Sequence, residues 1–452
     1  MGIFKAYDIR GIVPDQLDAE TARKIGSAFA RLVEGKRLVV GQDMRTHSPE
    51  IADAVAAGMR DAGATVLRLG LASTPMTYHG IGSLDCDGGL VVTASHNTGE
   101  WNGFKLCRAG AKPISGANGI KDIERMVGEA QPEPVAERGG EERVELLENY
   151  ADHVASFANL EGEITVAIDA ANGIAGHTLP AILPKLQGVT AHTMLMEPDG
   201  SFPVHEANPL KEEVLEYAGK FVRETGARLG VSFDGDADRC CFVDEKGDPV
   251  GADLITALLA RDYAARAAGT PIVYDLRSSW VVKEEILRLG GTPIRDRVGH
   301  SFIKATMRDK GALFGGELSG HFYFAENHVC DSGVIAMVRV LSMLTRPEYA
   351  QRPFSEILAD LRRYHSTGEI NFRVPDKDEA IAALKSKFSD GRQDELDGIT
   401  VEYGELGEPE WWWFNVRASN TEPLLRLNLE ASHSALRDQR RDELVGLLGQ
   451  PV

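Results

Sequence analysis

The sequence has few cysteines, no long hydrophobic run and a deficit of positive charge. Only five of its 452 residues are cysteine, and no two of them form a C-x-x-C pair. An odd number without such a pair fits a reducing compartment better than a disulfide framework. No run of about 18 apolar residues occurs, so no membrane-spanning helix is expected.

Basic residues are in the minority, with 49 Lys and Arg against 68 Asp and Glu and a formal net charge of −19. A nucleic-acid binder is disfavoured because affinity for DNA or RNA comes mainly from basic surface. A small anionic substrate in a locally basic site is compatible with this charge. The first residues, MGIFKAYDIRG, show neither a signal peptide nor a myristoylation motif. We therefore expect a cytoplasmic protein without nucleic-acid or membrane partners.

The chain does contain a repeated pattern. Three segments share one order, in which an apolar run is followed by an aspartate, a loop of small residues and an amphipathic helix. The aspartates are Asp43, Asp169 and Asp275, and each helix leads into another short apolar run. A strand–helix–strand unit is indicated, with parallel strands because a crossover helix joins them. The three units indicate either a duplication or the similarity that βαβ units share in all α/β proteins.

The C-terminal residues follow a different pattern. INFRV, ITVEY, WWWFNVRA and LLRLNLEA are typical of strands, with helices expected near 376–388 and 435–449. Strands without crossover helices indicate an α+β module. The predicted fold class is α/β, with three similar mixed-sheet α/β domains and a C-terminal α+β domain around a central cleft. We expect boundaries at 1–147, 148–250, 251–365 and 366–452, with linkers in QPEPVAERGGEER and TRPEYAQRP.

The loop DGDADR places Asp234, Asp236 and Asp238 at alternate positions after an apolar strand. Three carboxylates this close raise one another's pKa unless a hard cation neutralises them, and Mg²⁺ is the natural candidate. An EF-hand is disfavoured although Glu245 occupies the twelfth loop position, because Arg239 stands at the sixth, where glycine is needed. A solvated acidic turn is the remaining alternative.

Two further motifs offer polar groups for a small ligand. In GELSGH, Glu317 and Ser319 are two residues apart on an extended loop and can face a pair of sugar hydroxyls together, with His321 beside them. RVGHSFIK adds Gly299 and His300, although a packing or capping role is the alternative for that histidine.

RASNTEP combines a guanidinium with hydroxyl, amide and backbone donors, which suits a phosphate. Its candidates are Arg417, Ser419, Asn420 and Thr421. By itself this motif is equally typical of a polar turn that ends in proline.

Ser95 lies in TASHN, directly after the apolar run GGLVV. A serine hydroxyl is a poor nucleophile at neutral pH and needs a base, or an electrophile activated by a metal and positive charge. His96 beside it and Lys105 downstream would satisfy this need if the acidic loop lay opposite. KAYDIRG adds Tyr7 and Arg10, where an ordinary first strand is the alternative.

In their order, KAYDIRG, TASHN with NGFK, DGDADR, VGHSFIK, GELSGH and RASNTEP resemble the loops of the α-D-phosphohexomutases, specifically the phosphomannomutase/phosphoglucomutase group. The resemblance covers the whole chain and implies three similar α/β domains with a fourth α+β domain. It implies reversible phosphoryl transfer between the 1- and 6-positions of mannose or glucose phosphate, through a phosphoserine and a hexose 1,6-bisphosphate. Mg²⁺ is the implied cofactor, with glucose or mannose 1,6-bisphosphate as activator.

The same resemblance implies roles for single residues. Ser95 would be the phosphoserine, with Arg10 and His96 near the transfer centre and Lys105 as proton shuttle. Mg²⁺ would bind a phosphoserine oxygen together with Asp234, Asp236 and Asp238. The implied substrate-binding residues are Glu317, Ser319, His321, Arg417, Ser419, Asn420, Thr421, Tyr7, Arg239, Arg277, Gly299 and His300.

One position departs from the family, which usually has proline where this chain has Thr98. Loss of a fixed φ can loosen the loop, but it removes no reacting group. Glucose and mannose phosphates both stay open as substrates. Phosphoglucosamine mutase, a metal-dependent phosphomonoesterase and a non-enzymatic sugar-phosphate sensor are the alternatives. We expect a monomer that acts on hexose phosphates, with a dimer as the alternative.

Overall fold

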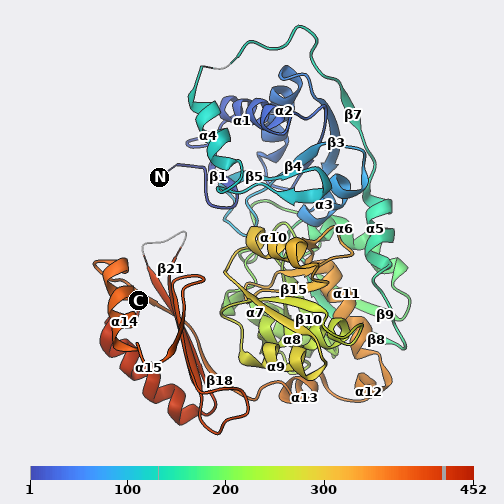
Figure 1. Cartoon of the computed structure of the whole chain (residues 1–452). Helices are drawn as coiled ribbons and strands as arrows, with labels where there is room; N and C mark the ends of the chain where they lie inside the picture. The colour runs from blue at the N-terminus through green and yellow to red at the C-terminus, as the bar shows by residue number, and fades with distance from the viewer. Residues whose placement is uncertain (1, 131, 420–423) are drawn as a thin grey trace. The chain divides into compact units, whose positions relative to one another are not determined.

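The computed structural model describes residues 2–130, 132–419 and 424–452, and the chain divides into two compact units (Figure 1). Unit 1 comprises Met1–Ala252 and Ser319–Ser355, and unit 2 comprises Asp253–Leu318 and Glu356–Val452. All five cysteines are free, in agreement with the expected lack of a disulfide framework. Among the described residues, none of the helices is both long and apolar enough to cross a membrane.

The first sheet of unit 1 has seven strands in the order β1-β5-β4-β2-β3-β7, with β6 paired to β5. The strands are β1 (Ile9–Ile12), β2 (Arg37–Gln42), β3 (Thr65–Leu71), β4 (Gly88–Val92), β5 (Trp101–Arg108), β6 (Lys112–Pro113) and β7 (Glu141–Arg143). β2 runs parallel to β3 and β4, which confirms the first predicted strand–helix–strand unit. β5 runs antiparallel to both β4 and β1, so the sheet is mixed.

Helices cover both faces of this sheet (Figure 1). One face carries α1 (Ala19–Leu32), α2 (Ser48–Asp61) and α4 (Ile120–Gly128), and the other carries α3 (Thr74–Ser83). Side chains alternate along β2: Leu38 and Val40 join the core beneath α1 and α2, while Val39 faces Gly80 of α3. Burial on both faces explains why this strand is an unbroken apolar run.

The second sheet of unit 1 has the order β12-β11-β10-β8-β9. Its strands are β8 (Ile164–Asp169), β9 (Val189–Met194), β10 (Leu229–Phe233), β11 (Cys240–Val243) and β12 (Pro249–Val250), and the accompanying helices are α5 (Leu147–Ala155), α6 (Ala175–Ile182) and α7 (Glu212–Thr225). β8 runs parallel to β9 and β10, whereas β11 is antiparallel to β10. The loop DGDADR therefore joins two antiparallel strands and not two helices, which confirms that it is not an EF-hand.

Unit 1 is completed by four elements from later in the chain, namely β16 (Phe322–Phe324), β17 (Cys330–Asp331), α11 (Gly333–Leu344) and α12 (Pro347–Ala350). The two segments expected to be linkers are not structureless. QPEPVAERGGEER contains β7, which pairs in parallel with β3, and TRPEYAQRP contains α12. The composition of both segments concealed these short elements.

Unit 2 contains three parallel strands, β13 (Pro271–Asp275), β14 (Thr292–Asp296) and β15 (Phe314–Gly316), with β13 between the other two. The helices that accompany them are α8 (Ala252–Ala264), α9 (Trp280–Arg288), α10 (His300–Lys310) and α13 (Phe354–Ala359). The repeated aspartates occupy equivalent positions, since Asp169 ends β8, Asp275 ends β13 and Asp43 follows β2 directly.

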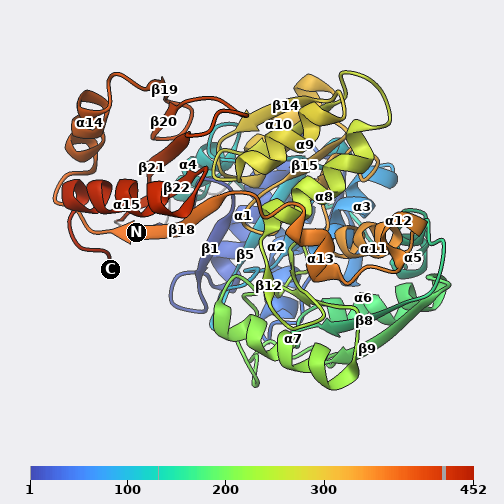
Figure 2. The same ribbon diagram turned by 90° about the horizontal axis from the view of Figure 1, so that it is seen from below.

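The C-terminal sheet of unit 2 is entirely antiparallel, in the order β18-β22-β21-β20-β19. Its strands are β18 (His365–Phe372), β19 (Arg392–Asp394), β20 (Ile399–Tyr403), β21 (Trp412–Ala418) and β22 (Leu425–Ala431). The helices α14 (Lys377–Lys387) and α15 (Ser434–Leu448) pack on it around one apolar cluster (Figure 2). The predicted α+β module and both of its helices are confirmed.

Candidate active site

Ser95 lies in the loop that follows β4, where it is fully buried and has a left-handed φ of 54°. Its backbone N–H donates to Thr93 Oγ1 at 2.9 Å. A non-glycine residue in this conformation is uncommon, and it is found where surrounding contacts hold the chain in place.

The side chain of Arg45 supplies those contacts. Its two terminal nitrogens donate to the carbonyl oxygens of Ser95 at 2.8 Å, Asn97 at 2.6 Å, Thr98 at 2.7 Å and Trp101 at 3.0 Å. The guanidinium is completely buried, and its planar fork can reach several acceptors at once. Sequence reasoning missed this residue, although it follows the first repeated aspartate by two positions. One of these hydrogen bonds is to the Thr98 carbonyl, so Arg45 fixes the loop that carries Ser95 without the proline that the family usually has at position 98.

The buried carboxylates of Asp234, Asp236 and Asp238, hereafter the acidic trio, lie against this loop. The Ser95 hydroxyl donates to Asp234 Oδ2 at 2.9 Å, so the structure brings together the two motifs that were expected to meet. Burial, and then the neighbouring carboxylates, raise the pKa of Asp234 well above its usual range.

The acidic trio fits a hard divalent cation. Each residue offers a carboxylate oxygen, and these oxygens lie within 4.8 Å of one another. Asp236 Oδ1 is buried and accepts no hydrogen bond from any residue that the structure describes. Three converging carboxylates, one with an unused oxygen, are a donor set that Mg²⁺ favours.

Lys105, on β5, extends into the acidic trio. Its ammonium donates to Asp236 Oδ2 at 2.6 Å and more closely to Asp238 Oδ2. Burial lowers the pKa of Lys105, but Asp236 and Asp238 raise it more, so the net shift is upward. The same contact acts on Asp238, where burial raises the pKa but Lys105 and His321 bring it well below its usual range. Lys105 is therefore positively charged in this arrangement.

Cations surround the ring of His96. Arg239 Nη2 donates to His96 Nδ1 at 2.6 Å, and that ring nitrogen lies 3.2 Å from Ser95 Oγ. Burial and then Arg239, Arg10 and Lys105 hold the pKa of His96 well below its usual range. The imidazole is consequently neutral and aligned beside the serine.

Arg10 binds the same loop from β1. Its Nη1 donates to Asn97 Oδ1 at 2.7 Å and to the Ala94 carbonyl at 3.1 Å, and Asp8 Oδ2 accepts from its Nε at 2.7 Å. Tyr7 is half-buried in the bend before this strand. Sequence reasoning had named Arg10 and Tyr7 but not Asn97, which is the partner that orients the arginine.

The residues of the GELSGH motif belong to different units, since Glu317 lies in unit 2. Ser319 and His321 lie in unit 1, where Ser319 Oγ is 2.8 Å from His321 Nδ1. His321 Nε2 lies 3.6 Å from Asp238 Oδ1 and 3.9 Å from Asp331 Oδ2. His321, expected to bind substrate, thus also contacts the acidic trio. Asp331, buried at the end of β17, carried no sequence signal.

Unit 2 holds the remaining candidates. Glu317 is buried, and its Oε1 accepts from the Gly299 backbone N–H at 2.8 Å, directly before His300 begins α10. Asp275 Oδ2 accepts from Arg277 Nη2 and from the Leu318 N–H, both at 2.7 Å. The third repeated aspartate therefore fixes both the arginine and the loop that bears Glu317.

Three arginines gather around one carboxylate in unit 2, and we name Arg277, Arg417 and Arg426 the arginine cluster. Glu369 Oε2 lies 3.8 Å from Arg277 Nη1 and 3.2 Å from Arg417 Nη2, and its Oε1 lies 3.1 Å from Arg426 Nη1. Glu369 thus bridges the three guanidinium groups, and Asp275 is a second carboxylate partner of Arg277. Guanidinium groups can bind the oxygens of a phosphate in a bidentate manner.

Sequence reasoning found Arg277 and Arg417 but missed Glu369 and Arg426. Burial and then the nearby Arg277 lower the pKa of Arg417, which shows the mutual repulsion within the cluster. Ser419 is buried at the end of β21, whereas Asn420 and Thr421 lie outside the described residues.

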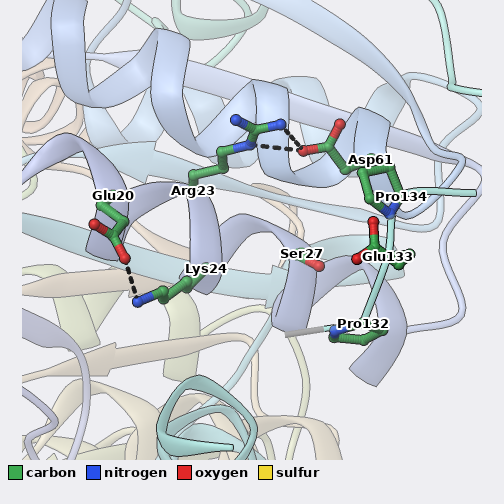
Figure 3. A pocket seen from close by; sticks show the side chains of 8 residues that line it. All are labelled: Glu20, Arg23, Lys24, Ser27, Asp61, Pro132, Glu133 and Pro134. Atoms are coloured by element: carbon green, nitrogen blue, oxygen red, sulfur yellow. Dashed lines mark hydrogen bonds and ion pairs between the residues drawn. The ribbon is translucent and has the colours of Figure 1, made fainter. Parts of the chain in front are cut away.

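A separate pocket in unit 1 is shown in Figure 3. It is lined by Glu20, Arg23, Lys24, Ser27, Asp61, Pro132, Glu133 and Pro134. Both cations have carboxylate partners at 2.6 Å, Arg23 with Asp61 and Lys24 with Glu20. A phosphate would have to displace these partners, and none of the predicted site residues lines the pocket, so it is not the candidate site.

Comparisons with known proteins agree with this geometry. Four family profiles match in succession, namely the phosphoglucomutase/phosphomannomutase alpha/beta/alpha domains I, II and III at residues 1–133, 148–247 and 251–364, and the C-terminal domain at 369–447. A phosphomannomutase of Escherichia coli is 37% identical over 98% of both chains.

Solved structures are similar as well. A phosphoglucomutase/phosphomannomutase family protein of Burkholderia thailandensis has a TM-score of 0.89 at 31% identity, covering 99% of this chain and 96% of that one. An N-acetylphosphoglucosamine mutase of Aspergillus fumigatus, solved with glucose 1,6-bisphosphate, shares the fold at 15% identity and a TM-score of 0.59, covering 98% of this chain and 95% of that one.

Proposed function

Since this chain belongs to the phosphoglucomutase/phosphomannomutase family, we propose that it moves a phosphoryl group reversibly between the 1- and 6-positions of mannose phosphate, glucose phosphate or both. It is a phosphohexomutase, an isomerase. The observation that best supports the proposed chemistry is the contact between the Ser95 hydroxyl and Asp234 in the acidic trio.

Ser95 is the proposed carrier of the phosphoryl group. In the first step, the bond between Ser95 Oγ and phosphorus breaks while phosphorus bonds to the free hydroxyl oxygen of a hexose 1-phosphate. The sugar hydroxyl proton passes to a base, the released Ser95 Oγ takes up a proton, and a hexose 1,6-bisphosphate results. The bisphosphate turns end over end and returns its other phosphoryl group to Ser95 Oγ. In that step the serine hydroxyl loses its proton and the released sugar oxygen takes one up.

Charged side chains around Ser95 support this transfer. Phosphoryl transfer depends on in-line positioning and on neutralisation of the equatorial oxygens. Arg10 and the neutral His96 border the serine loop, and Lys105 is the proposed proton shuttle. As an ammonium, Lys105 can protonate the sugar oxygen released in the return step, and loss of that proton prepares it to act as base in the next cycle.

Mg²⁺ is the proposed cofactor. Asp234, Asp236 and Asp238 would hold it together with an oxygen of phosphorylated Ser95, since their donor set fits this ion. When bound, Mg²⁺ would neutralise developing charge on the transferring group.

The residues of unit 2 are proposed to bind the rest of the substrate. The arginine cluster with Ser419, Asn420 and Thr421 would hold the phosphate that is not reacting, and the convergence of three guanidinium groups supports this role. Glu317 and Ser319 would read the sugar hydroxyls, with Tyr7, Arg239, Gly299, His300 and His321 as further contacts. The sugar must bind in two orientations, and both orientations present its O3 and O4 hydroxyls. We therefore propose that Glu317 and Ser319 bind these two hydroxyls.

We also propose a division into four domains, at 1–147, 148–250, 251–365 and 366–452. The four consecutive family matches support these boundaries. A cytoplasmic location is proposed on the basis of the five free cysteines. We also propose a monomer, with a dimer as the alternative. Glucose or mannose 1,6-bisphosphate is the proposed activator, because it can phosphorylate an unmodified Ser95.

The decisive test is a coupled mutase assay on the wild type, Ser95→Ala and the control Ser366→Ala, with mannose 1-phosphate and glucose 1-phosphate as substrates. Ser366 is exposed and lies in the C-terminal module. Wild type and control should turn over at least one of the two substrates at equal rates, and Ser95→Ala should be inactive on both. Undiminished turnover by Ser95→Ala would overturn the proposal.

A further inference from the structure

Three histidines that the proposed mechanism does not use gather in unit 1. His79 lies in α3, His153 in α5 and His328 in the turn between β16 and β17, and one ring nitrogen of each lies within 4.8 Å of the others. The helices α3 and α5 lie side by side (Figure 1). Imidazole nitrogens from separate elements are typical ligands of transition metals such as Zn²⁺.

Hydrogen bonds to asparagine determine which nitrogen of two rings carries the proton. His79 Nε2 lies 2.8 Å from Asn149 Oδ1, and His153 Nε2 lies 2.9 Å from Asn327 Oδ1. An amide oxygen only accepts, so each Nε2 is protonated and each Nδ1 keeps its lone pair. The Asn327 amide is itself oriented, because its Nδ2 donates to the Cys330 carbonyl at 3.3 Å. Metal-binding histidines are commonly oriented by such an oxygen partner.

The spacing of the nitrogens suits a tetrahedral ion. His328 Nε2 and His79 Nδ1 are 3.3 Å apart and share a hydrogen bond, in which His328 Nε2 is the donor, and a bound ion would take the place of its proton. Two ligands at the usual Zn–N distance subtend an edge of about 3.3 Å in a tetrahedral site. The His79 and His153 rings are stacked, with centroids 4.2 Å apart, so a rotation of the His153 ring is required for it to become the third ligand.

The backbone and packing hold His328 in this position. It has a left-handed φ of 54°, and a Cβ on Gly82 would lie 2.4 Å from its ring. The set contains no carboxylate, which favours Zn²⁺, Co²⁺ or Ni²⁺ over Mg²⁺.

We propose that His79, His153 and His328 form a second metal site, specific for a divalent transition metal, with solvent as the fourth ligand. The site would stabilise the fold. At the start of α3, Thr74 Oγ1 donates to Asp236 Oδ2 at 2.7 Å. An ion bound to His79 would tie this helix to α5 and to the turn at His328, at a distance from the proposed chemistry.

The test uses Co²⁺, whose visible absorption reports tetrahedral coordination, added to the full-length protein in excess Mg²⁺ to occupy the acidic trio. His328→Asn keeps a residue type that tolerates left-handed backbone, and His153→Gln removes a ligand from a helix. The matched control is His192→Asn, in the edge strand β9. Unfolding midpoints in EDTA check that each variant is folded.

Wild type and His192→Asn should bind about one Co²⁺ per chain with intense tetrahedral bands, and Zn²⁺ should raise their unfolding midpoints above the EDTA values. Both cluster variants should lose the bands and the Zn²⁺-dependent rise while keeping mutase activity in Mg²⁺. If one variant fails to fold, the other decides. Absence of tetrahedral bands in the wild type, or equal binding by a folded cluster variant, would overturn the proposal without affecting the proposed mutase function.

Discussion

The hydroxyl of Ser95 and the carboxylate of Asp234 lie 2.9 Å apart, although 139 positions separate them in the chain. The contact joins the loop after β4 to the loop after β10, each of which follows a strand buried along its whole length. The ends of these two strands bring their polar loops together in space. Residues that act together can therefore lie far apart in the sequence.

Asp236→Asn should reduce mutase turnover by about 10²-fold or more, because it removes a carboxylate proposed to bind Mg²⁺ and a partner of Lys105. The Mg²⁺ concentration for half-maximal rate should rise as well. Steady-state assays over a Mg²⁺ titration measure both effects. Asp248→Asn, at an exposed position, is the control. An Asp236→Asn enzyme with unchanged rate and unchanged Mg²⁺ dependence would contradict the metal assignment.

Arg45→Lys should lower both stability and kcat, since lysine cannot reach the four carbonyl oxygens that the guanidinium binds. Buried acceptors left without donors cost about 1–3 kcal/mol each, and some loop movement will recover part of this. We expect a loss of about 2–4 kcal/mol in urea denaturation. KM should change less than kcat, because Arg45 positions the serine and not the sugar. The control is Arg37→Lys, because the Arg37 side chain is half-exposed. An Arg45→Lys protein as stable and active as the wild type would contradict the proposed role of Arg45 in holding the loop.

The fold class, the repeated units and the acidic trio could be predicted because each leaves a local signal: an apolar run, a helix period or a dense polar loop. Arg45, Glu369 and Arg426 could not, since each acquires its role only through partners distant in sequence. The contacts of His321 with the trio were missed for the same reason. The spacing of Glu317 and Ser319 in GELSGH predicted a sugar-binding pair. It could not show that His321 lies beside Asp238, because that contact forms only when the chain folds.

Glu369→Gln should tighten binding of inorganic phosphate and of hexose phosphates, because it removes the one carboxylate that bridges the arginine cluster. Arg417→Ala should weaken the same ligands by about tenfold or more, through loss of a charge-assisted contact. Isothermal titration with mannose 1-phosphate measures both changes, and Arg441→Ala, on α15, is the control. Equal affinities in all four proteins would show that the cluster does not bind the phosphate.

Glu430 should make stability depend on pH. It is fully buried, with its Oε2 accepting from the Trp280 N–H at 2.8 Å and from Trp413 Nε1 at 3.0 Å. Burial raises the pKa of Glu430 to about 7, from an ordinary value near 4.5. The folded state therefore holds this proton more tightly than the unfolded state does, so the contribution is complete below about pH 4.5 and is lost as the pH rises through about 7.

Glu430→Gln should remove that loss and stabilise the protein at pH 8 relative to the wild type, by up to about 3 kcal/mol. At pH 5 the two proteins should be similar. Urea unfolding followed by tryptophan fluorescence at pH 5 and pH 8 measures the difference, because Trp280, Trp411 and Trp413 form a cluster around this site. Parallel curves for the two proteins across this range would contradict the assignment.

The central claim is that Ser95 passes its phosphoryl group to a sugar and not to water. Protein first phosphorylated with ³²P-labelled glucose 1,6-bisphosphate, and freed of excess reagent, is mixed with unlabelled mannose 1-phosphate for a single turnover. The label should leave a peptide containing Ser95 and appear first in a hexose bisphosphate and then, once the other phosphoryl group has returned to Ser95, in mannose 6-phosphate. Its appearance as inorganic phosphate, or its location on any other residue, would contradict the account.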